Sequence, residues 1–278
     1  MSSFYSPPFQ RIAIGHREEF SQHGAVKAAI AEFLGTLVFV FAAEGSIVSF
    51  EKLTSVTAYS PAGLTAVALA HATAFFVAVA MTFNLSGGHI NPAVTLGLMF
   101  GGHITVLRSI LYWIAQLAGS LVACLLILVA TGGLPTPEQT LTTGETWWAA
   151  LVLEIVITFG LVFTVYATTV DPRAKGNVHG IAPLAAGLIV GANILMAAAL
   201  SFGSALVTWD WNYHWIYWAS GGALAGIIYK VLFYPHDMHR DYESLPHEFY
   251  VSASSIQQGL CSLRSLWVSW PCTTSLYL

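Results

Sequence analysis

Long apolar stretches constrain this chain more than any other feature. The windows 107–130 and 147–170 each approach the roughly 20 residues needed to cross about 30 Å of hydrocarbon. Over all 278 residues, 56% are hydrophobic and only 9% are charged. One water-soluble core cannot bury that much apolar surface, so the sequence predicts an integral membrane protein in contact with membrane lipid.

Apolar runs bounded by Gly, Pro and charged residues predict an all-α chain with six spans. These lie near residues 26–49, 63–83, 106–130, 147–170, 180–196 and 214–234. We expect one membrane domain over 25–234, a polar amino-terminal tail over 1–24 and a polar carboxyl-terminal tail over 235–278. An even number of spans places both tails on one side of the membrane.

The basic residues indicate which side this is. All but Lys52 fall in the tails or in the second and fourth connections: Arg11, Arg17, Lys27, Arg108, Arg173, Lys175, Lys230, Arg240 and Arg264. Because basic residues stay cytoplasmic, both termini are predicted to be cytoplasmic. The same residues are scattered, without a dense Lys/Arg run, so no nucleic-acid partner is expected.

An internal repeat is visible when the two halves are compared. Glu32 lies near the start of the first span, and Glu154 lies early in the fourth. The predicted repeats cover about 25–130 and about 147–234, with three spans each. An odd number of spans per repeat inverts the second copy in the membrane, which typically places a transport path at the repeat interface.

The segment 84–100 predicts a short helix that enters the membrane without crossing it. Asn91 suits the cap position and Pro92 the first helical turn, and Gly87 and Gly88 allow an extended backbone to approach it. Irregular backbone at membrane depth must face protein or water. The positive helix end would repel cations while Asn91 donates a hydrogen bond to a neutral molecule. Taken alone, Asn-Pro-Ala fits an ordinary loop equally well.

The run 86–95, Ser-Gly-Gly-His-Ile-Asn-Pro-Ala-Val-Thr, resembles the first signature loop of the aquaporins, and the resemblance continues through 111–116. Further phrases at 39–46, 68–72, 181–184, 190–195 and 214–218 are similar to those of plant tonoplast intrinsic proteins. The resemblance covers roughly 24–234. It implies an aquaporin-like bundle of six transmembrane helices with an inverted repeat and re-entrant half-helices.

The resemblance also implies a function. It indicates a passive channel for water and small neutral solutes in the vacuolar membrane, assembled as a tetramer, without catalysis or a cofactor. The three cysteines, Cys124, Cys261 and Cys272, show no paired spacing, so neither a metal site nor a disulfide is predicted.

Particular residues receive roles from the same resemblance. The retained pore signature comprises Gly88, His89, Asn91, Pro92 and Ala93. His71 would lie at the selectivity filter with Ile194 facing it, although a lone His in an apolar span also fits a packing role. Glu32 and Glu154 would be buried structural acids that hold the backbone of the re-entrant loops.

The second signature loop of the family is degenerate here. The flanking residues align Ala197, Ala198 and Ala199 with the second signature, and Leu200 takes a filter position that is often Arg in relatives. Asn91 would then orient water alone. Because alanines are strong helix formers, the fifth span could continue through this segment as one helix.

Two alternatives follow from these residues. The lost signature also fits a non-conducting paralog that acts as a partner subunit in a hetero-tetramer. An ion-coupled carrier would require Glu32 or Glu154 to titrate in the transport path.

Overall fold

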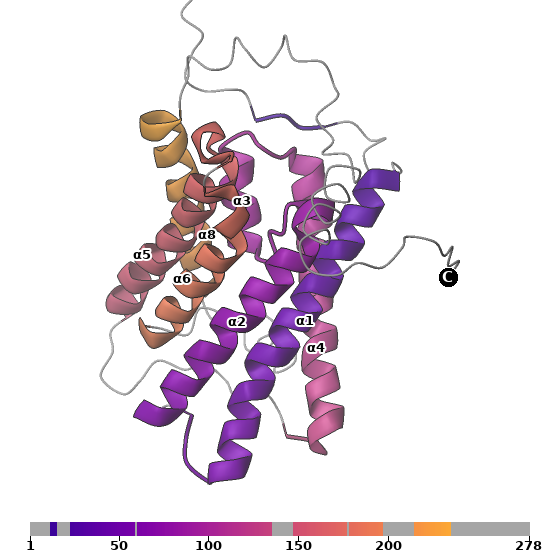
Figure 1. Ribbon diagram of the computed structural model, residues 1–278, viewed down its shortest axis with the longest axis vertical. Helices are drawn as coiled ribbons and strands as arrows, with labels where there is room; N and C mark the ends of the chain where they lie inside the picture. The colour runs from indigo at the N-terminus through magenta and orange to yellow at the C-terminus, as the bar shows by residue number, and fades with distance from the viewer. Residues whose placement is uncertain are drawn as a thin grey trace, which may run out of the picture. The chain divides into compact units, whose positions relative to one another are not determined.

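A computed structural model of the chain describes residues 12–15, 23–58, 60–134, 147–176, 178–196 and 214–234. Within these residues the architecture is helical, as predicted (Figure 1). The helices are α1 (His23–Thr54), α2 (Pro61–Ser86), α3 (Pro92–Phe100), α4 (Val106–Thr131), α5 (Trp147–Val165), α6 (Ala182–Met196) and α8 (His214–Ile228). One turn of π-helix follows α5, η2 (Tyr166–Val170), and another follows α8, η5 (Tyr229–Phe233).

Each predicted span coincides with a helix. Within the described residues, four segments are long and apolar enough to cross a membrane: Gly24–Thr54, Pro61–Ser86, Val106–Thr131 and Val152–Val170. Two shorter apolar helices, His179–Leu195 and Ala219–Phe233, match the fifth and sixth predicted spans. The first helix continues past its predicted end at residue 49 to Thr54. No Gly or Pro interrupts residues 49–54, so nothing local stops the helix earlier.

Local chemistry explains where the long helices begin and end. Ser60 caps α2, with its Oγ accepting a hydrogen bond from the Gly63 amide at 3.2 Å. Thr105 caps α4 in the same way, accepting from the Arg108 amide at 3.2 Å. The carboxyl end of α4 is Gly132, whose φ of 76° is left-handed. A left-handed residue at this position ends a helix, and Gly adopts it without steric cost.

The helices pack as two similar groups of three. In the first half, α1 packs on α2 and on α4, and in the second half, α5 packs on α6 and on α8 (Figure 1). The most extensive contact in the bundle joins α2 to α6, one helix from each half. The short helix α3 belongs to the first half by sequence, but it packs mainly on α8 of the second half. The two halves are therefore interlocked through α3.

Glycines let α6 approach the backbone of α2. A Cβ atom on Gly187 would lie 2.4 Å from the carbonyl oxygen of Ala72, and one on Gly191 would lie 2.7 Å from the Ala72 side chain. Gly187 and Gly191 are one helical turn apart and face the same neighbour. Small residues at this spacing bring membrane helices into backbone contact, which increases their dispersion contacts.

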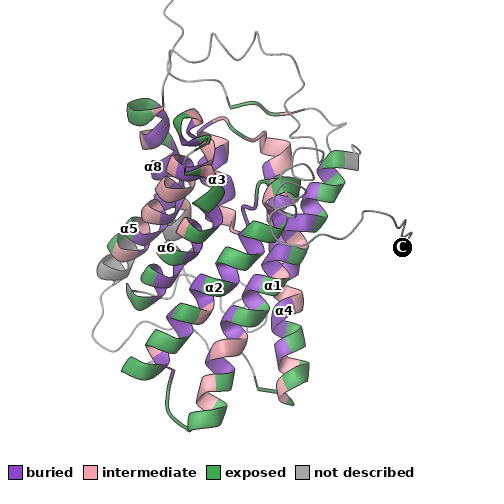
Figure 2. Ribbon diagram, viewed as in Figure 1, coloured by how far each residue is buried: buried purple, intermediate pink, exposed green. Residues whose placement is uncertain are grey.

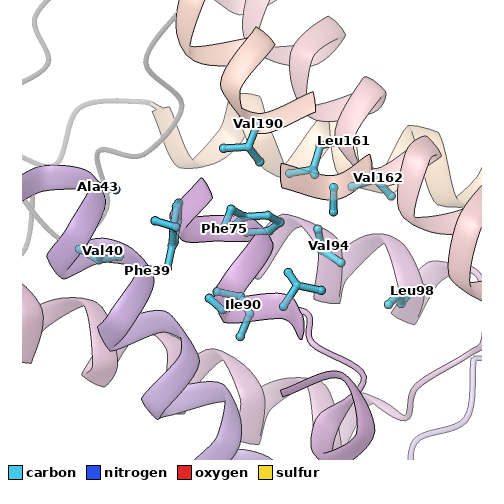
Figure 3. Packing of buried hydrophobic residues seen from close by; sticks show 14 of the residues in the cluster. Phe39, Val40, Ala43, Phe75, Ile90, Val94, Leu98, Leu161, Val162 and Val190 are labelled. Carbon is cyan, nitrogen blue, oxygen red and sulfur yellow. The ribbon is translucent and has the colours of Figure 1, made fainter. Parts of the chain in front are cut away.

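The core of the bundle draws residues from both halves (Figure 3). Phe39 of α1 and Phe75 of α2 meet edge to face, with ring centroids 5.0 Å apart. Val94 of α3 is buried in the same cluster, together with Val162 of α5 and Val190 of α6. The short helix α3 is thus packed into the middle of the protein.

The outer surface is also apolar. On α1 the exposed large side chains recur at about one helical turn, on the side away from the bundle: Val26, Ile30, Leu34, Val38 and Phe41. Figure 2 shows the same separation of buried and exposed sides along α1 and α2. Such a stripe would cost free energy in water, and it suits contact with lipid chains.

Candidate functional site

The loop between α2 and α3 has a left-handed backbone at three positions. Gly87 has φ 91°, Gly88 has φ 64° and Ile90 has φ 53°. The expectation of an extended backbone at the two glycines was therefore wrong. A Cβ atom on Gly88 would also lie 3.0 Å from the carbonyl oxygen of Val79. Gly88 is thus required both for its φ and for the close approach of the loop to α2.

Glu32 of α1 holds this loop. Its carboxylate is fully buried, and its Oε1 accepts hydrogen bonds from the Ser86 hydroxyl at 2.5 Å and the His89 amide at 3.0 Å. Its Oε2 accepts from the Ile90 amide at 2.7 Å and from Gln116 Nε2 at 2.7 Å. An ionised carboxylate has about four acceptor sites. Occupation of all four offsets the cost of burying its charge.

Ile90 has an unusual conformation that these contacts stabilise. A β-branched residue with positive φ is strained, at a cost on the order of 1–3 kcal/mol. Its amide donates to Glu32, and its side chain is buried in the core beside Val94 (Figure 3). The hydrogen bond and the burial together offset the strain.

Asn91 caps α3 and keeps half of its amide group available. Its Oδ1 accepts hydrogen bonds from the Ala93 amide at 2.7 Å and the Val94 amide at 3.3 Å, and Pro92 occupies the first helical position. No described residue accepts a hydrogen bond from Asn91 Nδ2. The amino end of α3 thus carries a donor that is not used within the described part of the chain.

Side chains of α4 complete the support of the loop. Gln116 Nε2 donates to Thr95 Oγ1 at 3.0 Å, and His89 Nδ1 lies 3.0 Å from the same hydroxyl. Tyr112 donates to the carbonyl oxygen of Ser86, at the end of α2, at 2.9 Å, and Trp113 donates to that of Pro92, at the start of α3, at 3.1 Å. The sequence analysis gave these side chains of α4 no role. The signal was the run 111–116, which resembles the family directly after the first signature.

His71 lies in α2 with 1% of its surface exposed. Its Nδ1 is 2.8 Å from the carbonyl oxygen of Val67, one turn earlier. A carbonyl can only accept, so Nδ1 carries the proton and Nε2 of the neutral ring is an acceptor. The ring meets Phe39 edge to face, with centroids 6.3 Å apart.

The other predicted filter residue in the described part of the chain is Ile194. It is buried on α6 in one cluster with Val67 and Ala68 of α2. Val67 is also the residue whose carbonyl oxygen lies beside the His71 ring. The remaining predicted residues, Leu200 and Ala197, Ala198 and Ala199, lie outside the described residues.

Glu154 is buried on α5 with 8% of its surface exposed. The second loop that it is expected to hold falls within 197–213, which is outside the described residues. Among the residues that are described, no group of three His, Cys, Asp or Glu side chains could hold a metal ion.

An ionic cluster joins the connection after α5 to η5, the turn that follows α8. Asp171 forms an ion pair with Arg173, accepts from the Arg173 amide at 2.8 Å and accepts from the Tyr229 hydroxyl at 2.7 Å. The hydrogen bonds from Arg173 and then that from Tyr229 outweigh the effect of burial and lower the pKa of Asp171 to about 2. Arg173 also donates to the Phe233 carbonyl at 2.8 Å.

Several known proteins are similar to this chain in sequence. Probable aquaporin TIP1-1 of Oryza sativa subsp. japonica is 55% identical over 251 residues, covering 86% of this chain and 98% of the relative. Aquaporin TIP1-1 of Zea mays is 54% identical over 255 residues, covering 87% of this chain and 100% of the relative.

A solved structure, that of the aquaglyceroporin from Plasmodium falciparum, resembles the fold with a TM-score of 0.61. It is 22% identical, and the match covers 75% of this chain and 96% of that one. The family described as Major intrinsic protein matches residues 19–229, which include α1 through α6 and α8 up to the first residue of η5. This chain therefore belongs to the major intrinsic protein family, the family of the aquaporins.

Proposed function

We propose that this protein is a passive channel for water, and for small neutral solutes, in the vacuolar membrane. The observation that carries the proposal is the geometry of Asn91. Its Oδ1 caps α3, and its Nδ2 is left without an acceptor among the described residues. A free amide donor at the positive end of a helix can orient a neutral molecule such as water, and the helix dipole opposes cations. The similarity to aquaporins named TIP1-1 supports the same function and membrane.

The proposal assigns roles to the remaining residues. Gly88, His89, Pro92 and Ala93 shape the retained constriction around Asn91. His71 and Ile194, with Leu200, form the filter, and Ala197, Ala198 and Ala199 replace the second signature. Glu32 and Glu154 are structural acids that hold the two loops. No catalysis is part of this function.

The proposal also covers the organisation of the protein. The two repeats are about 25–130 and about 147–234, flanked by cytoplasmic tails over 1–24 and 235–278. The equivalent packing of α1 with α2 and α4, and of α5 with α6 and α8, supports the repeat. The assembly is a tetramer, and the outward apolar stripe of α1 is available for lipid or for a neighbouring subunit.

Stopped-flow shrinkage of proteoliposomes tests the function. The wild-type chain is expected to give fast water flow with a low activation energy, compared with empty liposomes. Asn91→Asp keeps the oxygen that caps α3 but replaces the free amide donor with negative charge. We expect this variant to fold, to pass less water and to admit cations.

Asn84→Asp is the matched control. It makes the same chemical change away from α3, because Asn84 is exposed in the last turn of α2. Equal flow through all three proteins would contradict the role of Asn91. Wild-type flow equal to that of empty liposomes would contradict the channel itself. In that case, a gain of flow on mixing with an intact relative would favour the non-conducting partner subunit.

A further inference from the structure

The carboxyl end of α3 is held by two side chains from the other half of the protein. The hydroxyl of Tyr166, in η2, donates to the carbonyl oxygen of Gly97 at 2.9 Å. The ammonium group of Lys230, in η5, donates to the carbonyl oxygen of Gly101 at 2.7 Å. Tyr166 is fully buried and Lys230 is 6% exposed. Both oxygens belong to the last turn of the short helix or to its cap.

The charge of Lys230 has a physical reason to be at this position. Burying an ammonium group is costly unless a partner compensates it. The last carbonyls of a helix lack partners within the helix and carry the negative end of its dipole, so a cation there is stabilised. Gly101 is the cap of α3, and its own amide turns back to Gly97 and Met99. Lys230 therefore supplies the charge and the hydrogen bond that this helix end lacks.

Lys230 projects from a segment that is itself fixed. The neighbouring Tyr229 is buried and donates to Asp171, and Arg173 donates to Phe233 at the end of the same turn. The rings of Tyr229 and Tyr166 lie with centroids 5.1 Å apart. These contacts attach η5 to the connection after α5, so the Lys230 side chain extends from a rigid position.

The two ends of α3 are thus held by different halves of the protein. Glu32 of the first half holds the loop before Asn91, and Lys230 of the second half holds Gly101. The helix has 9 residues, a rod of about 13 Å at 1.5 Å per residue. Displacement of either end of so short a rod moves the other.

We propose that Lys230 is a positioning residue of the channel, whose ammonium group anchors the carboxyl end of α3 and thereby fixes Asn91 at the other end. The proposal rests on the proposed function for its effect on water flow. The anchoring contact itself does not depend on that function.

Three substitutions test the proposal. Lys230→Met keeps the length of the side chain and removes its charge and donors, whereas Lys230→Arg keeps both. Lys27→Met is the control, because Lys27 is an exposed lysine on α1. Two quantities are measured on monodisperse protein: amide hydrogen exchange over residues 92–103, and water flow per folded protein in proteoliposomes.

We expect Lys230→Met to speed exchange of the amides of residues 101–103 by at least about tenfold, because the loss of a charge-assisted hydrogen bond favours local opening. We also expect a loss of water flow through the same variant. Lys230→Arg should restore both quantities, and Lys27→Met should change neither.

Unchanged exchange in Lys230→Met would overturn the anchoring role. Faster exchange with unchanged flow per folded protein would overturn the positioning role and leave Lys230 a stabilising residue only. Wild-type flow equal to that of empty liposomes would overturn the proposed function, and with it any effect on Asn91 in a water path. The exchange comparison needs no conduction, so it would still support or overturn the hold of Lys230 on α3.

Discussion

Glu32 is the residue on which the loop before α3 most depends, because four donors converge on its buried carboxylate. Glu32→Gln would replace one carboxylate oxygen with an amide NH2 group, which donates and cannot accept, so two of these donors would lose their acceptor. Each buried donor left without an acceptor costs about 1–3 kcal/mol, so for two donors we expect a loss of about 2–6 kcal/mol in stability. The thermal unfolding midpoint in detergent should fall accordingly, and water flow should fall with it.

Glu51→Gln is a matched control for this change. Glu51 lies in the last turn of α1, is partly exposed and accepts one hydrogen bond from the described residues, that from the Ala58 amide at 3.0 Å. We expect its unfolding midpoint to change little. Equal midpoints for the two variants would contradict the role given to the Glu32 network.

Residues differ in how far the sequence alone could predict their part in this loop. The cap at Asn91 followed by Pro92 is a local pattern, and it predicted the start of α3. The left-handed conformation of Ile90 has no such signal, because isoleucine disfavours it. It depends on a hydrogen bond to Glu32, 58 residues earlier in the chain. Long-range contacts of this kind leave no periodic pattern to detect.

Among the elements, α3 and α8 approach each other backbone to backbone at Gly226. A Cβ atom on Gly226 would lie 2.2 Å from the carbonyl oxygen of Gly97 and 2.9 Å from its carbonyl carbon. Both are backbone atoms, so no side-chain rotation can relieve the overlap. Gly226→Ala must therefore push α3 and α8 apart, and we expect a loss of at least about 2 kcal/mol.

The unfolding midpoint in detergent measures this loss, and Gly45→Ala is its control. A Cβ atom on Gly45 of α1 would meet nothing within 4 Å, and alanine in a helix is favoured over glycine by about 1 kcal/mol. The control variant should be as stable as the wild type or more stable. A midpoint for Gly226→Ala that matches the control would show that the α3–α8 contact is looser than the structure indicates.

The connection between α5 and α6 gives stability a dependence on pH. Asp171 has its pKa lowered from 3.8 to about 2, chiefly by hydrogen bonds from Arg173. The stabilisation from its ionised form is therefore fully present above about pH 4 and is lost as the pH falls towards 2. Asp171→Asn should be less stable than the wild type at neutral pH, and the difference should shrink over this window.

Unfolding midpoints of the two proteins across about pH 2–6 measure the effect. The difference between the proteins is the relevant quantity, because other carboxyl groups titrate in both. A difference that stays constant with pH would mean that the charge of Asp171 contributes nothing through Arg173.

Element boundaries show how far sequence patterns reach. The six apolar spans were predicted because their length and hydropathy are properties of the segments themselves. The π-helical turns η2 and η5 were not predicted, since they continue the same helices and no Gly or Pro marks where they begin. The hold of Lys230 on Gly101, across 129 positions of the chain, was not predicted either. Both features depend on how the two halves pack.

For the whole molecule, the distribution of basic residues predicts which face is cytoplasmic, and cysteine labelling in intact vacuoles tests it. Lys52 lies in the last turn of α1, and Lys175 is exposed in the connection between α5 and α6. In a background with Cys261→Ser and Cys272→Ser, the remaining native cysteine is the buried Cys124. A membrane-impermeant maleimide added outside should label Lys175→Cys, and should label Lys52→Cys only after permeabilisation.

The outcomes separate two properties of the membrane topology. The reverse labelling pattern would place both termini in the vacuolar lumen while keeping the number of spans, because Lys52 and Lys175 would still face opposite sides. Labelling of both variants from the outside would contradict the span count itself, since three membrane crossings separate Lys52 from Lys175 in the predicted topology. The inverted repeat also requires an odd number of crossings between these two lysines. Each repeat of three spans ends on the membrane face opposite to the one where it began.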